Sequence, residues 1–293
     1  MLPLYPNLTP VSLDLREQIQ NIILKFQIGI SSLAFANLYL FRKKYCFKVS
    51  LLENGLLIAG AEREKTFFSI LGDLPQKEIL NELLKKYHRW KNISGEQAAK
   101  LNALLPNNII SEDRDNFEYL YLRTDLAELP GKNFQKKRNL VNAFIKAYVP
   151  EEREIKILNK NTLKDALHVL DEWSHGKGEH RDYDPAKEAV ELHELLGFSG
   201  LVFYVKGISV GYCQGEILAD GKSFTVHFEK AIDKYKGVYQ YINQEFAKTI
   251  PESITYINRE QDLGNEGLRQ AKMTYRPVDF VKLFSINAST KAL

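Results

Sequence analysis

Apolar positions recur along this chain with two different spacings, and each spacing predicts a different kind of element. Apolar residues three and four positions apart indicate helices, and alternating runs bounded by turn residues indicate strands. In the first half, helical spacing covers residues 13–26, 32–42, 75–90 and 133–148. Strand-like runs cover residues 46–52, 56–61, 66–71 and 117–122, with a hairpin signal, Asn54-Gly55, between the first two.

The second half of the chain repeats this order of elements. A strand-like run at 155–158 precedes helical spacing at 163–173 and 185–196. Three further runs, at 200–205, 208–218 and 224–229, are separated by the turn signals Lys206-Gly207 and Asp220-Gly221. The last predicted elements are a helix at 237–248, a strand at 254–258, a helix at 265–273 and a strand at 278–284.

This repeated order predicts one mixed sheet in each half. A meander pairs its strands antiparallel, whereas a strand–helix–strand step makes a parallel, right-handed crossover. The predicted fold class is therefore α+β (mixed α/β), and the order matches the GNAT acyltransferase fold in two tandem copies, each a mixed sheet flanked by helices. The length of 293 residues suits two domains. We place them at residues 1–149 and 150–293, with the main candidate site in the second.

Composition and charge argue against several classes of protein. An apolar fraction of 44% supports packed cores, and a net charge of +3 lacks the basic excess of a dedicated nucleic-acid binder. Cys46 and Cys213 stand far apart in strand-like runs, which favours thiols in a reducing, cytoplasmic location over a disulfide. The most apolar stretch, residues 28–41, is too short to span a bilayer and no signal peptide is visible, so we expect no membrane association.

Metal binding is not expected either. His175 and His180 flank a Gly-containing loop that Asp182 and Asp184 follow. These residues lack the spacing of a ligand set, and a solvated loop explains them better. We therefore predict no metal site.

Four segments of the chain carry a resemblance to a known family. They are Lys136-Lys137-Arg138-Asn139, His227-Phe228-Glu229-Lys230-Ala231, residues 258–264 (Asn-Arg-Glu-Gln-Asp-Leu-Gly) and residues 268–277 (Leu-Arg-Gln-Ala-Lys-Met-Thr-Tyr-Arg-Pro). In this order they resemble the phosphatidylglycerol lysyltransferase C-terminal-like family of bacterial proteins, over about residues 32–284.

The resemblance implies two tandem GNAT-like domains, akin to the aminoacyl-tRNA-dependent transferases of peptidoglycan and lipid modification. It implies acyl-CoA or aminoacyl-tRNA as a donor substrate, with tRNA as a candidate partner, and no tightly bound cofactor. The best-known members modify lipid and carry a large membrane-embedded portion, which is not part of this sequence.

Polar residues gather where two of the predicted strands end. Alternation in the run 224–229 places His227 and Glu229 on the same face. If the crossover to the run 254–258 is parallel, both C-terminal ends share the edge where open sheets bind ligands. In GNAT folds the acyl donor enters where these two strands part. The residues predicted at this edge are His227, Glu229, Asn258, Arg259, Glu260 and Asp262, and the polar ones are candidates for substrate binding.

Transfer of an acyl or aminoacyl group to an amine needs a base for the attacking nitrogen and an acid for the leaving group. Glu229 and Glu260 are the candidate bases, because two neighbouring carboxylates in a partly dry cleft have pKa values that are pushed apart. By analogy with GNAT enzymes, Tyr275 is the candidate acid. These three residues are the predicted catalytic group.

Structural ion pairs are the alternative role for both carboxylates. Glu229 can pair with Lys230 or Arg259, and Glu260 can pair with Arg269. Arg269 and Lys272 are three residues apart on one helix face. They are predicted either to neutralise the acidic residues or to line the cleft.

The start of the helix at 237–248 is the candidate site for the donor's phosphates. Lys234, Lys236 and Gly237 precede or open this helix. A helix N-terminus presents free N–H groups to an anion, and glycine allows its close approach.

Arg138 is a further candidate for substrate binding, together with its neighbours Lys137 and Asn139. It falls on the apolar stripe of the helix at 133–148. A guanidinium there must reach a carboxylate, a ligand anion or water. A bridge between the two halves and a ligand contact are both open.

Three functions fit these observations. The first is an acyl- or aminoacyl-transferase that acts on an amine or hydroxyl. The second is a non-catalytic protein whose cleft binds an anionic metabolite or an RNA end. The third is a peripheral enzyme that aminoacylates a lipid headgroup.

Overall fold

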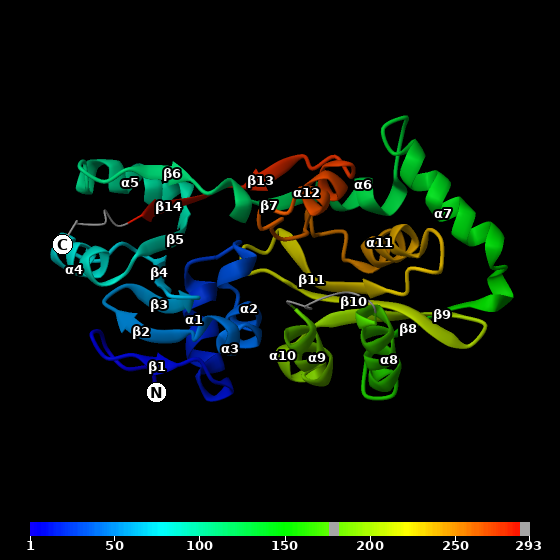
Figure 1. Ribbon diagram of the computed structural model, residues 1–293, viewed down its shortest axis with the longest axis horizontal. Coiled ribbons are helices and arrows are strands. Elements are labelled where there is room, and N and C mark those ends of the chain that lie inside the picture. The colour runs from blue at the N-terminus through cyan, green and yellow to red at the C-terminus, as the bar shows by residue number, and fades with distance from the viewer. Residues whose placement is uncertain (176–181, 288–293) are drawn as a thin grey trace.

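The computed structural model describes residues 1–175 and 182–287, and Figure 1 shows two lobes side by side, each built on a seven-stranded mixed sheet. The predicted class, α+β with two mixed sheets flanked by helices, is confirmed. The loop between His175 and Asp182 that was predicted to be solvated lies outside the described residues.

The first sheet forms the lobe at the left of Figure 1, in the order β1-β2-β3-β4-β5-β14-β6. Within it only β4 and β5 pair parallel. Its strands are β1 (Thr9–Pro10), β2 (Lys48–Leu52), β3 (Gly55–Glu62), β4 (Lys65–Gly72), β5 (Arg89–Ser94), β6 (Ile110–Glu112) and β14 (Leu283–Asn287). The accompanying helices are η1 (Leu13–Leu15), α1 (Arg16–Lys25), η2 (Ser31–Leu33), α2 (Phe35–Leu40), α3 (Arg42–Tyr45), α4 (Lys77–Lys86) and α5 (Gly95–Leu104).

The second sheet has the order β13-β7-β12-β11-β10-β9-β8, with β11 and β12 as its parallel pair. Helices α8, α9 and α10 lie on one side of it and α11 on the other (Figure 1). Its strands are β7 (Glu118–Leu122), β8 (Arg153–Ile157), β9 (Ser199–Val205), β10 (Ile208–Ile217), β11 (Ser223–Ala231), β12 (Tyr256–Asn258) and β13 (Asp279–Val281). The remaining helices are η3 (Arg114–Asn116), α6 (Arg123–Glu128), α7 (Gln135–Ala147), η4 (Pro150–Glu152), α8 (Leu163–Ser174), α9 (Tyr183–Glu191), α10 (His193–Leu196), α11 (Val238–Thr249) and α12 (Glu266–Met273).

Each sheet takes strands from both sides of the predicted boundary at 149/150. Strand β7, from the first half, pairs with β12 and β13 in the second sheet. Strand β14, from the end of the chain, lies between β5 and β6 in the first sheet. The run at 278–284, predicted as one strand, breaks between Val281 and Leu283 because its two parts join different sheets. No single cut at 149/150 separates the two sheets.

Both predicted meanders and the crossover from β11 to β12 are present. The crossover predicted from the run 66–71 to the run 117–122 is wrong, because β7 lies in the second sheet and β4 pairs parallel with β5, a strand that was missed. The helix predicted at 75–90 ends at Lys86, and the chain continues as a strand. Trp90 and Ile93 are both fully buried although they are three residues apart. Asn92 has a φ of 55° and the register shifts beside it, which turns both side chains inward. The buried positions of β5 therefore lack the alternation that marks a strand.

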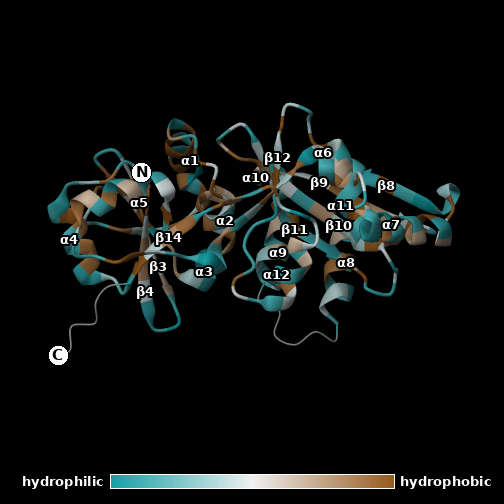
Figure 2. Cartoon of the chain, turned by 90° about the horizontal axis from the view of Figure 1, so that it is seen from above, coloured by the Kyte–Doolittle hydropathy of each residue, from teal (hydrophilic) through white to brown (hydrophobic). Residues whose placement is uncertain are grey.

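A shared core holds the two lobes together. One cluster of buried apolar residues runs from α1 and α2 to α8 and α9, and it includes Phe35, Leu38, Val169 and Val190. In Figure 2, which is coloured by hydropathy, α2 lies between the two lobes. Arg42 adds an ion pair with Glu188 of α9, with Nη2 and Oε1 2.6 Å apart. The first lobe therefore fixes one wall of the second.

Candidate functional site

The candidate site lies where β11 and β12 part. The two strands pair parallel at three positions, ending with Thr225 opposite Asn258. Strand β11 then runs on to Ala231, whereas β12 stops at Asn258 and the chain turns away. The predicted parallel crossover is thus present, and it brings the residues after Asn258 beside the second half of β11. This opening is the edge that the sequence indicated.

A β-bulge at His227 changes which side chains share a face. Val226 is opposite Gly215 and Phe228 is opposite Gln214, so His227 is an extra residue in β11. Gly215 is needed there, because a Cβ on it would lie 1.8 Å from the carbonyl oxygen of Thr225. Phe228 consequently joins the core on the α8–α9 side, and Val226 packs on the α11 side. The prediction that His227 and Glu229 share a face is wrong for this reason.

His227 lies between two carboxylates on the α8–α9 side of the sheet. Its Nδ1 is 2.9 Å from Glu260 Oε1, and its Nε2 is 3.0 Å from Glu216 Oε1. Asn37, from α2 of the first lobe, donates to the same Glu260 oxygen at 3.3 Å. Burial by itself lowers the pKa of His227, but the two carboxylates outweigh it and raise the pKa to about 10. His227 therefore holds its proton and binds Glu260.

Replacing His227 with Gln is expected to flatten the pH dependence of stability. The folded-state pKa of His227 is about 10, above the unfolded value of about 6.5. Its contribution is therefore complete below pH 6.5 and is lost as pH rises to 10, at about 1.4 kcal/mol per pH unit. Urea unfolding at pH 6, 7, 8 and 9 measures this. Profiles that stay parallel for wild type and the variant would contradict the assignment.

Glu118 of β7 is a buried hub that the sequence did not reveal. Its side chain is fully buried and accepts four hydrogen bonds. The backbone N–H groups of Ser31 and Ser32 donate at 2.9 and 3.1 Å. Asn258 Nδ2 donates at 2.6 Å and Gln261 Nε2 at 2.9 Å. Burial raises the pKa of Glu118, and these donors partly oppose the rise. Asn258, predicted to bind substrate, is thus occupied within the protein.

Glu229 and Arg259 form an ion pair on the other face of the sheet. Glu229 Oε1 accepts a hydrogen bond from Arg259 Nη2 at 3.0 Å, and both side chains are largely buried. The guanidinium lies 5.2 Å from the ring centroid of Tyr275. Burial raises the pKa of Tyr275 to about 12. Of the two partners proposed for Glu229, Arg259 is therefore the one it takes, whereas Lys230 pairs with Asp182, with Nζ and Oδ2 2.6 Å apart.

Lys137 reaches the same cluster from α7. Its Nζ lies 3.8 Å from the ring centroid of Tyr275. Burial and, to a smaller extent, the charge of Arg259 lower the pKa of Lys137, and Glu229 partly opposes them. The resulting pKa is about 8. Glu229, Arg259, Tyr275 and Lys137 thus converge from β11, the turn after β12, the segment after α12 and α7. We name these four residues the Arg259 cluster.

Asp262 and Arg269 form a second network, centred on the buried Asp262 carboxylate. Asp262 Oδ1 accepts from Arg269 Nη2 at 2.7 Å, and Tyr119 and Arg114 donate to Oδ2 at 2.5 and 3.2 Å. Burial by itself raises the pKa of Asp262, but Arg269 and Tyr119 outweigh it and hold the pKa well below its usual range. Arg269 also pairs with Asp115 at 2.7 Å. The alternative pairing of Glu260 with Arg269 is therefore wrong, since Asp262 takes this arginine.

Lys272 fixes the turn that carries Arg259 and Glu260. Asn265 caps the start of helix α12, and its side chain accepts from the Leu268 N–H at 2.9 Å. Two turns later, Lys272 Nζ donates to the carbonyls of Arg259 at 2.6 Å and Glu260 at 3.1 Å, and to that of Gln261. Glu260 has a φ of 56°, so its backbone is held in the left-handed region. Lys272 therefore positions the turn.

Arg138 does not bridge the two halves. It donates to the carbonyl oxygens of Leu129 and Gly131, in the segment just before α7, and to Gln135 Oε1 at 2.8 Å. Asn139 is exposed and accepts from Gln135 Nε2 at 2.8 Å. Of the two open alternatives, the bridge between the halves is therefore wrong, because the guanidinium bonds to carbonyl oxygens of the loop just before its own helix.

Gly237 at the start of α11 faces α7. A Cβ on Gly237 would lie 2.1 Å from the carbonyl oxygen of Leu140, and its φ is 85°. The N–H of Val238 donates to the Tyr235 carbonyl at 3.1 Å. Lys234 and Lys236 are exposed on this turn. The glycine therefore serves the packing of α11 against α7.

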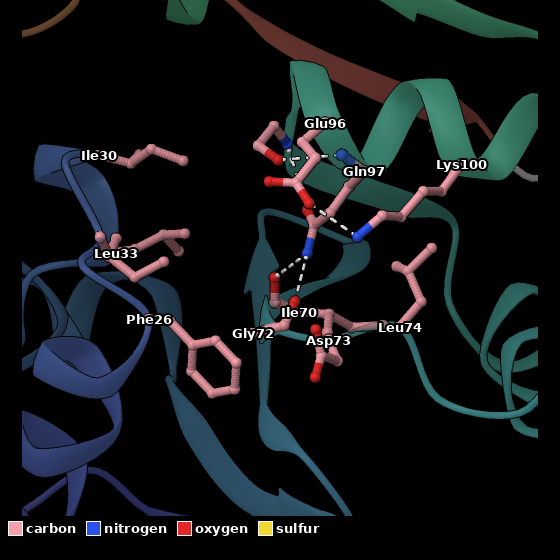
Figure 3. Close-up of a pocket in the computed structure, with 12 residues that line it drawn as sticks. Phe26, Ile30, Leu33, Ile70, Gly72, Asp73, Leu74, Glu96, Gln97 and Lys100 are labelled. Atoms are coloured by element: carbon pink, nitrogen blue, oxygen red, sulfur yellow. Dashed lines mark hydrogen bonds and ion pairs between the residues drawn. The ribbon is translucent and has the colours of Figure 1, made fainter.

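Two pockets among the described residues lie away from the Arg259 cluster. One, of about 260 Å³, lies between the start of α8 and helices α9 and α10. The other, of about 140 Å³, is bordered by Phe26, Leu33, Ile70 and Leu74 in the first lobe, and Figure 3 shows it beside α5. There Gln97 Nε2 donates to the carbonyls of Ile70 and Gly72 at 3.0 Å. The Gln97 side chain thus occupies the carbonyl groups at the C-terminal end of β4, the corresponding position in the first sheet.

The described residues contain no group of three or more His, Cys, Asp or Glu side chains arranged to hold a metal ion. Among these residues, no helix has the length and apolar character needed to cross a membrane.

The structure has two mixed sheets, each with a parallel pair that parts at its C-terminal end, as expected for the fold class predicted from the sequence. The sequence profile of one family, described as phosphatidylglycerol lysyltransferase, C-terminal, matches residues 25–287. The chain belongs to this family, and the predicted resemblance is confirmed.

Solved structures agree over almost the full length. A conserved protein of unknown function from Bacteroides thetaiotaomicron is 31% identical, with a TM-score of 0.86 and coverage of 98% of this chain and 99% of that chain. L-PGS from Bacillus licheniformis is 15% identical, with a TM-score of 0.65 over 94% of this chain and 93% of that one.

One relative is similar in sequence over part of the chain. It is an uncharacterized protein of Mycoplasmoides gallisepticum, 26% identical over 188 residues, which span 61% of this chain and 58% of that protein.

Proposed function

We propose that this chain transfers an aminoacyl or acyl group to an amine or hydroxyl at the edge where β11 and β12 part. The Arg259 cluster carries this proposal, because it joins two cations, a carboxylate and a phenol at the C-terminal end of a parallel pair. Ligands bind at such edges in open sheets. Membership of a family described as phosphatidylglycerol lysyltransferase, C-terminal, supports the same class of reaction.

The start of α11 favours an aminoacyl-tRNA donor over acyl-CoA. A CoA pyrophosphate would need the free N–H groups of this helix start. Leu140 of α7 abuts Gly237 there, and the Val238 N–H is already bonded to Tyr235. Lys234 and Lys236 remain available at the surface for a longer phosphate backbone. The donor proposed is therefore the charged end of a tRNA.

The Arg259 cluster also refines the proposed roles at the site. Arg259 would bind a carbonyl or phosphate oxygen of the substrates, with Glu229 holding the guanidinium in place. Tyr275, whose pKa is raised, keeps its proton and would donate it to the developing oxyanion or the leaving oxygen. Glu260 would act indirectly, since it binds His227 and shapes the turn.

A transfer assay with two donors and three acceptors tests the proposal. The donors are tRNA charged with radiolabelled amino acids and acetyl-CoA labelled in its acetyl group, and uncharged tRNA is the control that has no group to transfer. The acceptors are phosphatidylglycerol vesicles, a soluble primary amine and glycerol. Protein-dependent movement of label from charged tRNA to an acceptor supports the proposal, and the acceptor that gains label separates lipid from soluble substrates. Binding of charged tRNA without any transfer would instead support the non-catalytic alternative.

A non-catalytic role has one observation in its favour. Most charged side chains at the edge are already satisfied within the protein, Asp262 by Arg269 and Glu260 by His227. A purely structural edge predicts that the ion pairs matter for stability alone. Thermal shifts with small anions but with no form of tRNA would favour this alternative.

A further inference from the structure

Lys137 differs from its neighbours on α7 in what it contacts. Lys136 and Asn139 are exposed, and Arg138 is bonded to the loop before the helix. Lys137 is half-buried, and its Nζ lies 3.8 Å from the ring centroid of Tyr275. Its amine thus points into the Arg259 cluster, where an acceptor would meet the donor under the proposed function.

Two features of the surroundings of Lys137, its burial and a second cation, disfavour a charged ammonium, whereas the Tyr275 ring beneath Nζ favours it. Arg259, from the turn after β12, is a second cation nearby, and Glu229 of β11 is the carboxylate that acts on Lys137. Glu229 is already bonded to Arg259 at 3.0 Å. Among the described residues, none places a carboxylate within ion-pair distance of Lys137 Nζ. Burial and Arg259 together lower the pKa of Lys137 to about 8, so about one tenth of the amine is uncharged at pH 7, far more than for an ordinary lysine.

The other candidate bases at this edge are engaged. Glu229 Oε1 is bonded to Arg259, and Glu260 Oε1 is bonded to both His227 and Asn37. His227 itself stays protonated between two carboxylates. A general base must be an unprotonated group that can reach the reacting nitrogen or oxygen. Lys137 meets the first condition in its uncharged fraction, which grows as pH rises towards 8, and its amine faces the cluster where the second condition would be met.

We propose that Lys137 is the general base of the transfer reaction. This inference rests on the proposed function. As the acceptor's nitrogen or oxygen forms its bond to the carbonyl carbon of the donor ester, the uncharged Lys137 amine takes the acceptor's proton. The ester C–O bond then breaks, and the resulting Lys137 ammonium returns that proton to the leaving ribose oxygen. Arg259 and Tyr275 stabilise the charge on the carbonyl oxygen between these two steps.

Direct titration of the amine tests the premise without any need for activity. Lysines of the full chain are dimethylated with ¹³C-formaldehyde and followed by NMR from pH 6 to 11. The Lys137 signal is assigned by its loss in Lys137→Arg and its persistence in Lys136→Arg. A midpoint near 8 is expected, and a midpoint near the ordinary lysine value of about 10.4 would overturn the proposal.

Transfer kinetics test the role itself. Lys137→Arg keeps a cation and removes the base, so kcat is expected to fall about 10²- to 10⁴-fold with little change in KM. Wild-type kcat should rise with pH and level off above about 8, and this limb should be absent in the variant. Lys136→Arg is the matched control and should retain wild-type kcat. Wild-type transfer by Lys137→Arg would overturn the proposal, whereas no transfer by wild type, beside a midpoint near 8, would count against the proposed function alone.

Discussion

Replacing Arg259 with Met is expected to lower the free energy of unfolding by about 3–5 kcal/mol and to abolish measurable transfer. The substitution leaves the largely buried Glu229 carboxylate without its cationic partner. Replacing Glu229 with Met has the same cost for the opposite reason. Replacing both residues with Met removes both charges, so stability is expected to return to within about 1 kcal/mol of wild type. Urea unfolding of the four proteins measures this.

The double variant separates a structural role of this pair from a functional one. If Glu229 and Arg259 serve folding alone, the refolded double variant should transfer as well as wild type. If Arg259 binds the reacting groups, the double variant should be as stable as wild type yet at least about 100-fold slower. Lys206 and Glu152, an exposed pair 3.2 Å apart, give the matched control. Their double Met variant should change neither quantity by much.

Replacing Glu118 with Leu is expected to cost about 3–5 kcal/mol of unfolding free energy. The substitution removes the acceptor of four hydrogen bonds at once. Two of these donors are backbone N–H groups of the first lobe, and Asn258 belongs to the second sheet. Loss of Glu118 should therefore loosen the contact between lobes as well as the local fold. Chemical denaturation together with hydrogen exchange at residues 31 and 32 measures both effects.

A matched variant controls for the loss of one negative charge. Glu128, at the exposed end of α6, is replaced with Leu, and its stability is expected to stay within about 0.5 kcal/mol of wild type. Glu118→Gln tests geometry at nearly constant volume. The amide NH₂ of glutamine would face N–H groups that donate to Glu118 in wild type, so this variant should also be clearly destabilised. Wild-type stability of both Glu118 variants would contradict the hub described here.

The sequence could locate the edge because local rules determine it. A strand–helix–strand step fixes the direction of β12 relative to β11, so the residues after Asn258 had to lie beside Glu229. The pairing of Glu229 with Arg259 was open to prediction for the same reason. The meanders were equally clear, since turn signals separate their strands.

The arrangement within the edge depends on features that carry weak local signals. The bulge at His227 separates it from Glu229, and only the close approach of Gly215 to Thr225 shows why it forms. Glu118 was missed because its partners lie far away in sequence, at Ser31, Asn258 and Gln261. Its strand also belongs to the second sheet, although the chain order places it in the first half. Long-range pairing of this kind leaves no periodic trace.

The most direct test of transfer at the Arg259 cluster is one assay on two proteins. Wild type and the Glu229→Met, Arg259→Met double variant, both shown to be folded, are incubated with tRNA charged with radiolabelled amino acids and with each acceptor. The account predicts that wild type moves label from tRNA to one acceptor and that the double variant does so at least about 100-fold more slowly. Equal transfer by both proteins, or no transfer by wild type with any acceptor, would contradict it.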